Sequence, residues 1–250
     1  GDYAQQFPDR YDNPQWERPD LIVIWGNNPV VSNSDGLYGH WVVDCMKRGT
    51  KAIVIDPRLT WLASRAELFL QIRPGTDGAL ALGMANYLVE NDLYDREFVD
   101  LWCYGFEELA ERARDYPLDE VAEITEIPAE EIAAAARRIG AAERAILQWG
   151  VAIDQIKETI PTAQAVLALF EITGNIGKPG TMQQPASILN YAAGWGSEFL
   201  TPEQEAKRIG QEAHPLIKMG FQECVTDDYI RCLETGEPYP IKVAWMQTTN

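Results

Sequence analysis

Three short apolar runs, each closed by a turn rich in Gly or Pro that carries Asn or Asp, constrain this chain more than any other feature. They are Leu21 to Trp25 before Gly-Asn-Asn-Pro, Ala52 to Ile55 before Asp-Pro-Arg, and Leu68 to Ile72 before Arg-Pro-Gly-Thr-Asp. Continuous apolar runs of this length are typical of strands buried on both faces, as in parallel sheets. Because the carboxyl ends of parallel strands meet at one edge, where α/β proteins bind ligands, the sequence predicts a binding edge.

Helical patterns fill the intervals between these runs, and strands that alternate with helices predict an α/β fold. We expect helices at Ser34 or Asp35 to Arg48, Leu59 to Ala66, Thr76 or Asp77 to Glu90, within residues 95–140, and at Pro161 to Ile172, Pro202 to Ile209 and Cys224 to Glu234, with further strands at Ala145 to Trp149 and Ile241 to Trp245. The predicted architecture is a Rossmann-like three-layer domain with a mostly parallel sheet, plus part of a second α/β domain. Residues 1–19 are assigned to a lead-in from a preceding domain, 20–155 to the Rossmann-like domain, and 156–250 to a connecting helix, a loop-rich segment and the start of a truncated second domain.

The first turn, residues 26–29, has the residue types that suit phosphate binding. Gly26 permits a tight turn and a close approach of the backbone to a ligand, while Asn27 and Asn28 tolerate left-handed backbone and offer amide donors. A helix that follows such a turn presents free N–H groups to a pyrophosphate. The turn lacks the G-x-G-x-x-G pattern, so an ordinary NAD or FAD site is not indicated. A plain strand-to-helix connection is the alternative interpretation.

Two aspartates follow the second and third runs. Asp56 can accept hydrogen bonds from both hydroxyls of a ribose, and Arg58 can pair with a phosphate or with Asp56 itself. Asp77, which follows Gly75, can accept two N–H bonds from the guanine edge, where adenine has no such donor pair. Each aspartate could instead cap a helix. Three such turns aligned on one edge favour nucleotide binding.

Composition excludes several classes of function. The net charge is −17, from 21 Lys and Arg against 38 Asp and Glu, so a nucleic-acid partner is not expected. No segment is long and apolar enough to cross a bilayer, and direct membrane insertion is not expected. The four cysteines form no C-x-x-C pair and there are two histidines, so no metal site is expected from this chain alone.

Four strings in order resemble the signatures of molybdopterin oxidoreductases of the dimethyl sulfoxide reductase family. They are WGNNP at residues 25–29, IDPRLT at 55–60, RPGTDGAL at 73–80 and TGNIGKPG at 173–180. The resemblance covers Pro19 to Gly180 well and the remainder loosely. It implies an enzyme that carries out two-electron or oxygen-atom transfer at a molybdenum or tungsten bis(molybdopterin guanine dinucleotide) cofactor, whose metal does the redox chemistry.

The resemblance also implies which residues bind one nucleotide tail of that cofactor. Gly26, Asn27 and Asn28 would lie near the phosphates, Asp56 and Arg58 near the ribose, and Asp77 at the guanine. The full expected set is Trp25, Gly26, Asn27, Asn28, Pro29, Asp56, Arg58, Gly75, Asp77, Gln148, Gly150, Asn175 and Gly177. Within this set, Gln148 and Gly150 match a turn that lines the same cleft, and Asn175 and Gly177 match a loop on the pterin side.

This sequence has no match to the family's metal-ligating residue or to its iron–sulfur cysteine motif. The metal ligand and any [4Fe-4S] cluster cysteines are expected upstream, so the chain is interpreted as an internal fragment with no catalytic or metal-ligating residue of its own. A small-molecule substrate and an electron-transfer iron–sulfur subunit are the expected partners of the full-length enzyme, in the prokaryotic cytoplasm or periplasm.

Two alternatives share the fold. One is a domain that holds no cofactor and is purely structural, as in the large iron–sulfur subunit of NADH dehydrogenase; Asp56 and Asp77 favour cofactor binding over it. The other is a non-redox hydratase or hydroxyl transferase of the same family.

Overall fold

The computed structural model describes residues 17–32, 37–182, 199–214 and 224–245. The chain divides into two compact units, Gly1–Ala186 and Ser187–Asn250. Each unit is described by itself.

The first unit is built on a parallel sheet of four strands in the order β3-β2-β1-β4. The strands are β1 (Leu21–Trp25), β2 (Lys51–Ile55), β3 (Leu68–Leu70) and β4 (Ala145–Trp149). All residues of β1 and β4 are buried, as expected for strands covered on both faces. The predicted α/β class with a parallel sheet is confirmed.

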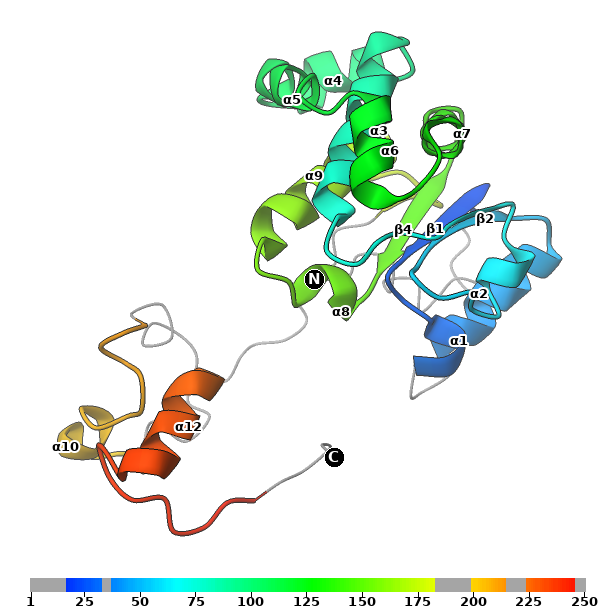
Figure 1. The fold of residues 1–250 in the computed structure, drawn as a ribbon. Coiled ribbons are helices and arrows are strands. Elements are labelled where there is room, and N and C mark those ends of the chain that lie inside the picture. Colours follow the sequence, from blue (N-terminus) through cyan, green and yellow to red (C-terminus); the bar gives the residue numbers. More distant parts are fainter. Residues whose placement is uncertain (1–16, 33–36, 183–198, 215–223, 246–250) are drawn as a thin grey trace. The chain divides into compact units, whose positions relative to one another are not determined.

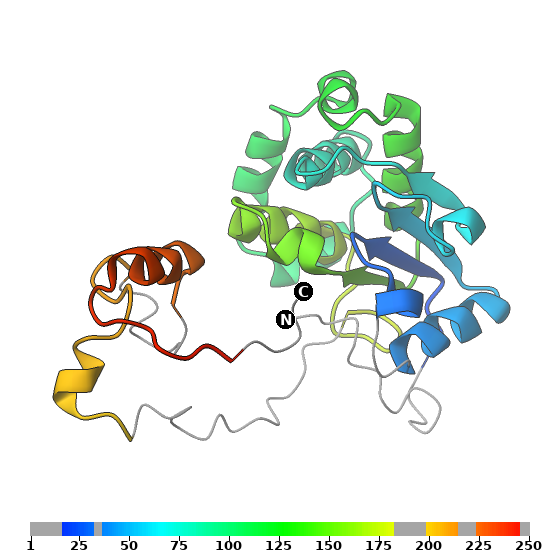
Figure 2. The same cartoon turned by 60° about the horizontal axis from the view of Figure 1, so that its bottom comes forward.

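Helices cover both faces of this sheet, which gives three layers (Figures 1 and 2). On one face lie α1 (Pro29–Ser32) and α2 (Leu37–Lys47), and Trp41 of α2 is 1% exposed in the core. The other face carries α3 (Asp77–Glu90), α7 (Ala129–Gly140) and α9 (Thr159–Ile172). The remaining helices of the unit are α4 (Arg96–Trp102), α5 (Phe106–Ala113), α6 (Leu118–Thr125) and α8 (Val151–Asp154).

Several predicted boundaries are wrong in ways that local hydrogen bonds explain. The third strand ends at Leu70, where its carbonyl accepts from Asp56 N at 3.2 Å, and does not reach Ile72. The helix expected at Leu59 to Ala66 is a single 3-10 turn, η2 (Ala63–Arg65), since the Thr60 hydroxyl accepts from Ala63 N and holds the chain in a local turn.

The second unit contains α10 (Pro202–Glu205) and α12 (Thr226–Thr235) in its described part. A capping box between Thr201 and Gln204 begins α10, which is shorter than predicted. The strand expected at Ile241 to Trp245 is not formed: Val243 and Trp245 are 86% and 88% exposed, and no described strand pairs with them. Across the described ranges of both units, no helix has the length and apolar character needed to cross a membrane.

Candidate functional site

The four strands of the sheet end in register at one edge. Trp25 pairs with Ile55 on one side and with Trp149 on the other, and Ile55 pairs in turn with Leu70. The turns that follow β1, β2, β3 and β4 therefore leave the sheet side by side. The three predicted turns meet at one edge, and a fourth turn, after β4, joins them; ligand binding at this edge stays a prediction.

Two glycines let the first and fourth turns approach each other closely. Gly26 has φ +59°, and a methyl group there would lie 2.5 Å from the Ala152 side chain. A methyl group at Gly150 would lie 2.7 Å from the Gly26 carbonyl oxygen. Gly26 N donates to Ile55 O at 2.8 Å and Gly150 N donates to Trp25 O at 3.2 Å, so each turn continues the sheet ladder for one more residue. A side chain at either position would push the turns apart.

The two asparagines of the first turn have different roles. Asn27 Nδ2 donates to the carbonyl oxygen of Trp149 at 3.0 Å, which ties the first turn to the end of β4. The Asn28 carbonyl accepts from Val31 N and Ser32 N and so begins α1, which places Pro29 buried at the first helical position. The side-chain oxygen of Asn28 is buried and has no hydrogen-bond partner among the described residues. A buried acceptor without a donor is costly, and a bound ligand can supply the donor.

Asp56 and Arg58 form the second turn. Asp56 is 3% exposed, and its Oδ1 accepts from Arg58 N at 2.8 Å. The guanidinium of Arg58 lies 3.7 Å from the same oxygen, while its side chain is 77% exposed. Asp56 is thus held in place by its own turn, and Arg58 can swing towards a ligand phosphate.

Asp77 reaches across from the third turn to the end of β1. Its Oδ1 accepts from Trp25 Nε1 at 2.8 Å, although β2 lies between β1 and β3 in the sheet. Asp77 is 5% exposed, and burial raises the pKa of its carboxyl group, against the opposing effect of the Trp25 hydrogen bond. Gly75, with φ +84°, makes the bend that brings the start of α3 to this position. Asp77 is therefore a carboxyl group that gains from a further N–H donor.

A hollow of about 610 Å³ opens beside the second and third turns. Its walls include Pro57, Gln71 and Arg73 from these turns. Gln71 lies inside the predicted third strand, Leu68 to Ile72, and is not among the predicted site residues. In the structure Gln71 follows the last strand residue, and its Nε2 donates to Pro57 O at 3.0 Å, joining the two turns. Gln71 is recognised as a turn residue only from the pairing of Leu70 with Ile55, which ends the strand one residue earlier. The sequence alone does not reveal this pairing.

Comparisons with known proteins give the family of the chain. The sequence model of the molybdopterin oxidoreductase family, described as "Molybdopterin oxidoreductase", matches residues 3–249. The chain belongs to this family. Acetylene hydratase of Syntrophotalea acetylenica is 40% identical over 234 residues, which is 82% of this chain and 31% of that protein. The thiosulfate reductase molybdopterin-containing subunit of Salmonella typhimurium is 30% identical over 243 residues, 92% of this chain and 31% of that protein.

A solved structure in the same family shares the fold. Acetylene hydratase from Pelobacter acetylenicus superposes with a TM-score of 0.71 at 31% identity, over 89% of this chain and 34% of that one. The chain thus spans about a quarter to a third of the length of the relatives that it matches.

Two of the predicted site residues, Asn175 and Gly177, do not lie with the others on the binding edge, and a third, Gln148, is buried beneath it. Gln148 is 0% exposed near the carboxyl end of β4, and its Nε2 donates at 3.1 Å to Trp149 O, the carbonyl oxygen that also accepts from Asn27 Nδ2. Asn175 is also fully buried, and its Oδ1 accepts from Ala145 N at 2.7 Å, at the amino end of β4. Gly177 belongs to the same loop, where its N–H bonds to Met182 O. The first unit uses Asn175 to hold this loop against the sheet; a role of the loop towards the pterin stays a prediction.

Proposed function

We propose that the carboxyl edge of this sheet holds one guanine dinucleotide tail of a molybdenum or tungsten bis(molybdopterin guanine dinucleotide) cofactor, within a longer oxidoreductase. The alignment of the four strand ends carries the proposal, because it brings Asn28, Asp56 and Asp77 to one edge. The buried, unpartnered Asn28 Oδ1 is independent support, since it requires a donor of the kind that a nucleotide hydroxyl or amine provides.

The residues present fit such a tail. The close packing of Gly26 and Gly150 leaves backbone at the surface of the turn, where a pyrophosphate can approach with Asn27, Asn28 and Pro29 beside it. Asp56 is buried with Oδ1 held by Arg58 N, and its other oxygen can accept from ribose hydroxyls; the 77% exposed side chain of Arg58 can leave Asp56 to reach a phosphate. Asp77 accepts from Trp25 through one oxygen and can accept the paired donors of guanine through its carboxylate.

We assign different roles to the metal of the cofactor and to the residues of this chain. The metal, when bound, supplies two-electron or oxygen-atom transfer. In the described part of the chain no group of three or more His, Cys, Asp or Glu residues could hold a metal ion. We therefore assign the chain a binding and orienting role, with the metal ligand and any iron–sulfur cluster elsewhere in the longer enzyme.

Nucleotide binding to the isolated chain tests the proposal. GMP should bind and AMP should bind at least about tenfold more weakly, since loss of a paired hydrogen bond to a buried charge costs about 1.4 kcal/mol or more. In the full-length enzyme, Asp77→Asn should lower guanine content, metal content and activity together. Equal affinity for GMP and AMP, or unchanged cofactor content in the variant, would contradict the proposal. Absence of nucleotide binding together with absence of metal in the full-length protein would favour the structural, cofactor-free alternative.

Hydration of a small unsaturated substrate is the second candidate for the reaction. Its support is that acetylene hydratase is both a 40% identical relative and a structural neighbour. The thiosulfate reductase relative supports the redox reaction instead. Consumption of acetylene by the full-length enzyme with no electron acceptor present would establish hydration, whereas turnover that requires a viologen dye would establish the redox reaction.

We also propose that the full-length enzyme is one subunit of an assembly with an electron-transfer iron–sulfur partner. The support is that the thiosulfate reductase relative is named as a molybdopterin-containing subunit. Co-purification of the tagged full-length enzyme with a second gene product at fixed stoichiometry tests this.

A further inference from the structure

Trp25 is fully buried, yet its side chain holds a group of the proposed nucleotide site. It is the last residue of β1 and lies between Ile55 and Trp149 of the neighbouring strands. Its carbonyl oxygen accepts from Gly150 N at 3.2 Å, so its backbone is fixed within the sheet. Its Nε1 donates to Asp77 Oδ1 at 2.8 Å. With 0% of its surface exposed, Trp25 can act on a ligand only through Asp77.

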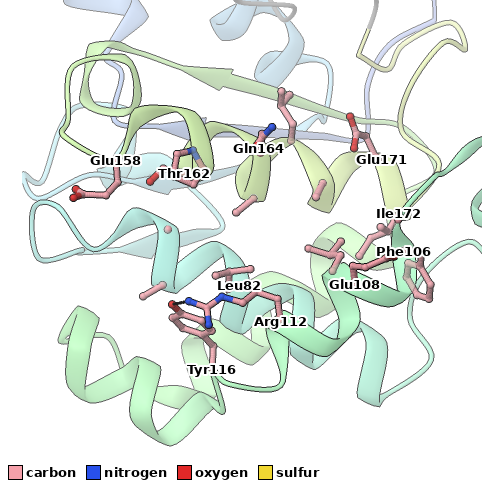
Figure 3. Close-up of a pocket in the computed structure, with 18 of the residues that line it drawn as sticks. Leu82, Phe106, Glu108, Arg112, Tyr116, Glu158, Thr162, Gln164, Glu171 and Ile172 are labelled. Atoms are coloured by element: carbon pink, nitrogen blue, oxygen red, sulfur yellow. Dashed lines mark hydrogen bonds between the residues drawn. The ribbon is translucent and has the colours of Figure 1, made fainter.

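The surroundings of Asp77 give this hydrogen bond a large share in holding the carboxyl group. Among the described residues Asp77 has no ion pair, and Trp25 is the side chain that donates to it. The third turn borders a hollow of about 980 Å³ between α3, α5 and α9, whose lining includes Gly75, Thr76 and, from α9, Thr162 (Figure 3). A methyl group at Gly75 would meet nothing within 4 Å. Because this turn has open space beside it, packing alone does not fix the plane of the Asp77 carboxyl group.

The plane of this carboxyl group decides which bases it can bind. Guanine presents two parallel donors, N1–H and the 2-amino group, and a carboxylate meets both only when its two oxygens lie in the plane of the base. Hypoxanthine presents N1–H without the amino group, and adenine has no such donor pair. The bond from Trp25 occupies one lone pair of Oδ1, so the other lone pair of Oδ1 and both of Oδ2 remain for a base.

We infer that Trp25 is a positioning residue, whose indole N–H fixes the plane of the Asp77 carboxyl group and thereby sets the preference of the site for guanine. This role rests on the proposed nucleotide binding at the sheet edge. A carboxyl group that is oriented before the ligand arrives loses less conformational freedom on binding, which favours the contact that needs both oxygens. The preference for guanine would then depend on a residue that does not touch the nucleotide.

Nucleotide titration of Trp25→Phe in the 250-residue chain tests this role. Phe keeps an aromatic ring in the core and removes the N–H. GMP affinity should fall about tenfold and inosine monophosphate affinity less than about threefold, because a contact of two hydrogen bonds depends most on orientation. AMP affinity should not change. A variant that is merely damaged would lose affinity for all three nucleotides equally.

The pH dependence of GMP binding gives a second readout. Burial raises the pKa of the Asp77 carboxyl group, and the hydrogen bond from Trp25 opposes this rise. Without the N–H the pKa rises further, so the pH below which GMP binding weakens should move upwards in Trp25→Phe. Loss of packing elsewhere in the core would leave this pH unchanged.

Trp41→Phe is the matched control, because Trp41 is a buried tryptophan of α2, on the other face of the sheet. This control should keep the nucleotide preference and the pH profile of the parent chain. If Trp25→Phe does not fold, benzothienylalanine in place of Trp25 keeps the size of the indole ring and has sulfur instead of the N–H.

Two outcomes would count against the role of Trp25, and they are distinguishable. A parent chain that prefers GMP, with a Trp25 variant of the same preference and the same pH profile, overturns the inference and leaves the nucleotide site in place. Equal affinity of the parent chain for GMP and AMP contradicts the proposed site itself, and the role of Trp25 with it.

Discussion

At the scale of single residues, the buried carboxyl group of Asp77 lowers the stability of the fold once it is ionised. Burial raises the pKa of the Asp77 carboxyl group above its ordinary value, so the folded state binds this proton more tightly than the unfolded state does. The contribution of this group to the free energy of unfolding is therefore fully present below the unfolded pKa and is lost as pH rises through the folded pKa. A carboxyl group kept here despite that loss is typical of a functional position.

Replacing Asp77 by Asn should separate these two effects. The amide oxygen can still accept from Trp25 Nε1, and no buried charge remains near neutral pH. We expect the free energy of unfolding near neutral pH to be unchanged or up to about 1 kcal/mol higher, and its dependence on pH in the acid range to flatten. GMP affinity should fall by at least about tenfold. Urea unfolding at several pH values and calorimetric titration measure both; a large loss of stability would show that the carboxylate is structural.

The affinity of the parent chain for GMP should depend on pH through the same group. The guanine donors favour the carboxylate, so binding should be tight above the folded-state pKa of Asp77 and weaken as pH falls through it. Calorimetry in two buffers of different ionisation heat should show proton release on binding near that pKa. Asp77→Asn is the control, because its weak residual binding should lack both the pH dependence and the proton release.

Gly26 and Gly75 allow a comparison between backbone strain and steric overlap. Both have positive φ, at +59° and +84°, but a methyl group at Gly26 meets Ala152 at 2.5 Å whereas one at Gly75 meets nothing within 4 Å. Gly75→Ala should cost about 1 kcal/mol of unfolding free energy, and Gly26→Ala about 2–4 kcal/mol. Urea unfolding measures the difference. Equal losses at the two positions would mean that the turns after β1 and β4 are not packed as the structure has them.

At the scale of elements, the loop after α9 is attached to β4 by two side chains, Asn175 and Met182, whose Sδ accepts from Leu147 N at 3.1 Å. Asn175 accepts from Ala145 N and donates through Nδ2 to Thr173, all within the buried interior. Asn175→Ala should cost about 1–3 kcal/mol, because it leaves the Ala145 N–H without its acceptor. GMP affinity should not change, since Asn175 lies at the amino end of β4. Thermal unfolding and GMP titration measure both properties. Asn175→Ala should lose stability and keep its GMP affinity, whereas Asp77→Asn should keep its stability and lose GMP affinity. A loss of GMP binding in Asn175→Ala would place Asn175 in the nucleotide site.

The bounds of an element were predictable where residues within the element set them. They were not predictable where pairing with a distant segment sets them. β4 and α3 have the bounds expected from their apolar runs and from Asp77 at the helix start. β3 was predicted too long because its end is set by pairing with Ile55, which no local pattern reveals. Ile241 to Trp245 has strong β propensity but no described strand beside it, and a strand forms only where hydrogen-bond partners exist. The turns were predictable at the site, whereas the Trp25–Asp77 contact, which links residues 52 positions apart, was not.

At the scale of the whole molecule, every residue assigned to the nucleotide edge lies in the first compact unit, Gly1–Ala186. The four strands, the helices on both faces and the buried core that supports the edge belong to the same unit. A chain ending at residue 186 should therefore unfold in one cooperative step and bind GMP with an affinity within about twofold of the 250-residue chain. Circular dichroism during urea unfolding and calorimetric titration measure the two properties. As the control, the same truncated chain with Asp77→Asn should fold and not bind. A truncated chain that folds but has lost GMP affinity would show that residues 187–250 complete the site, and the nucleotide tail would then need both units.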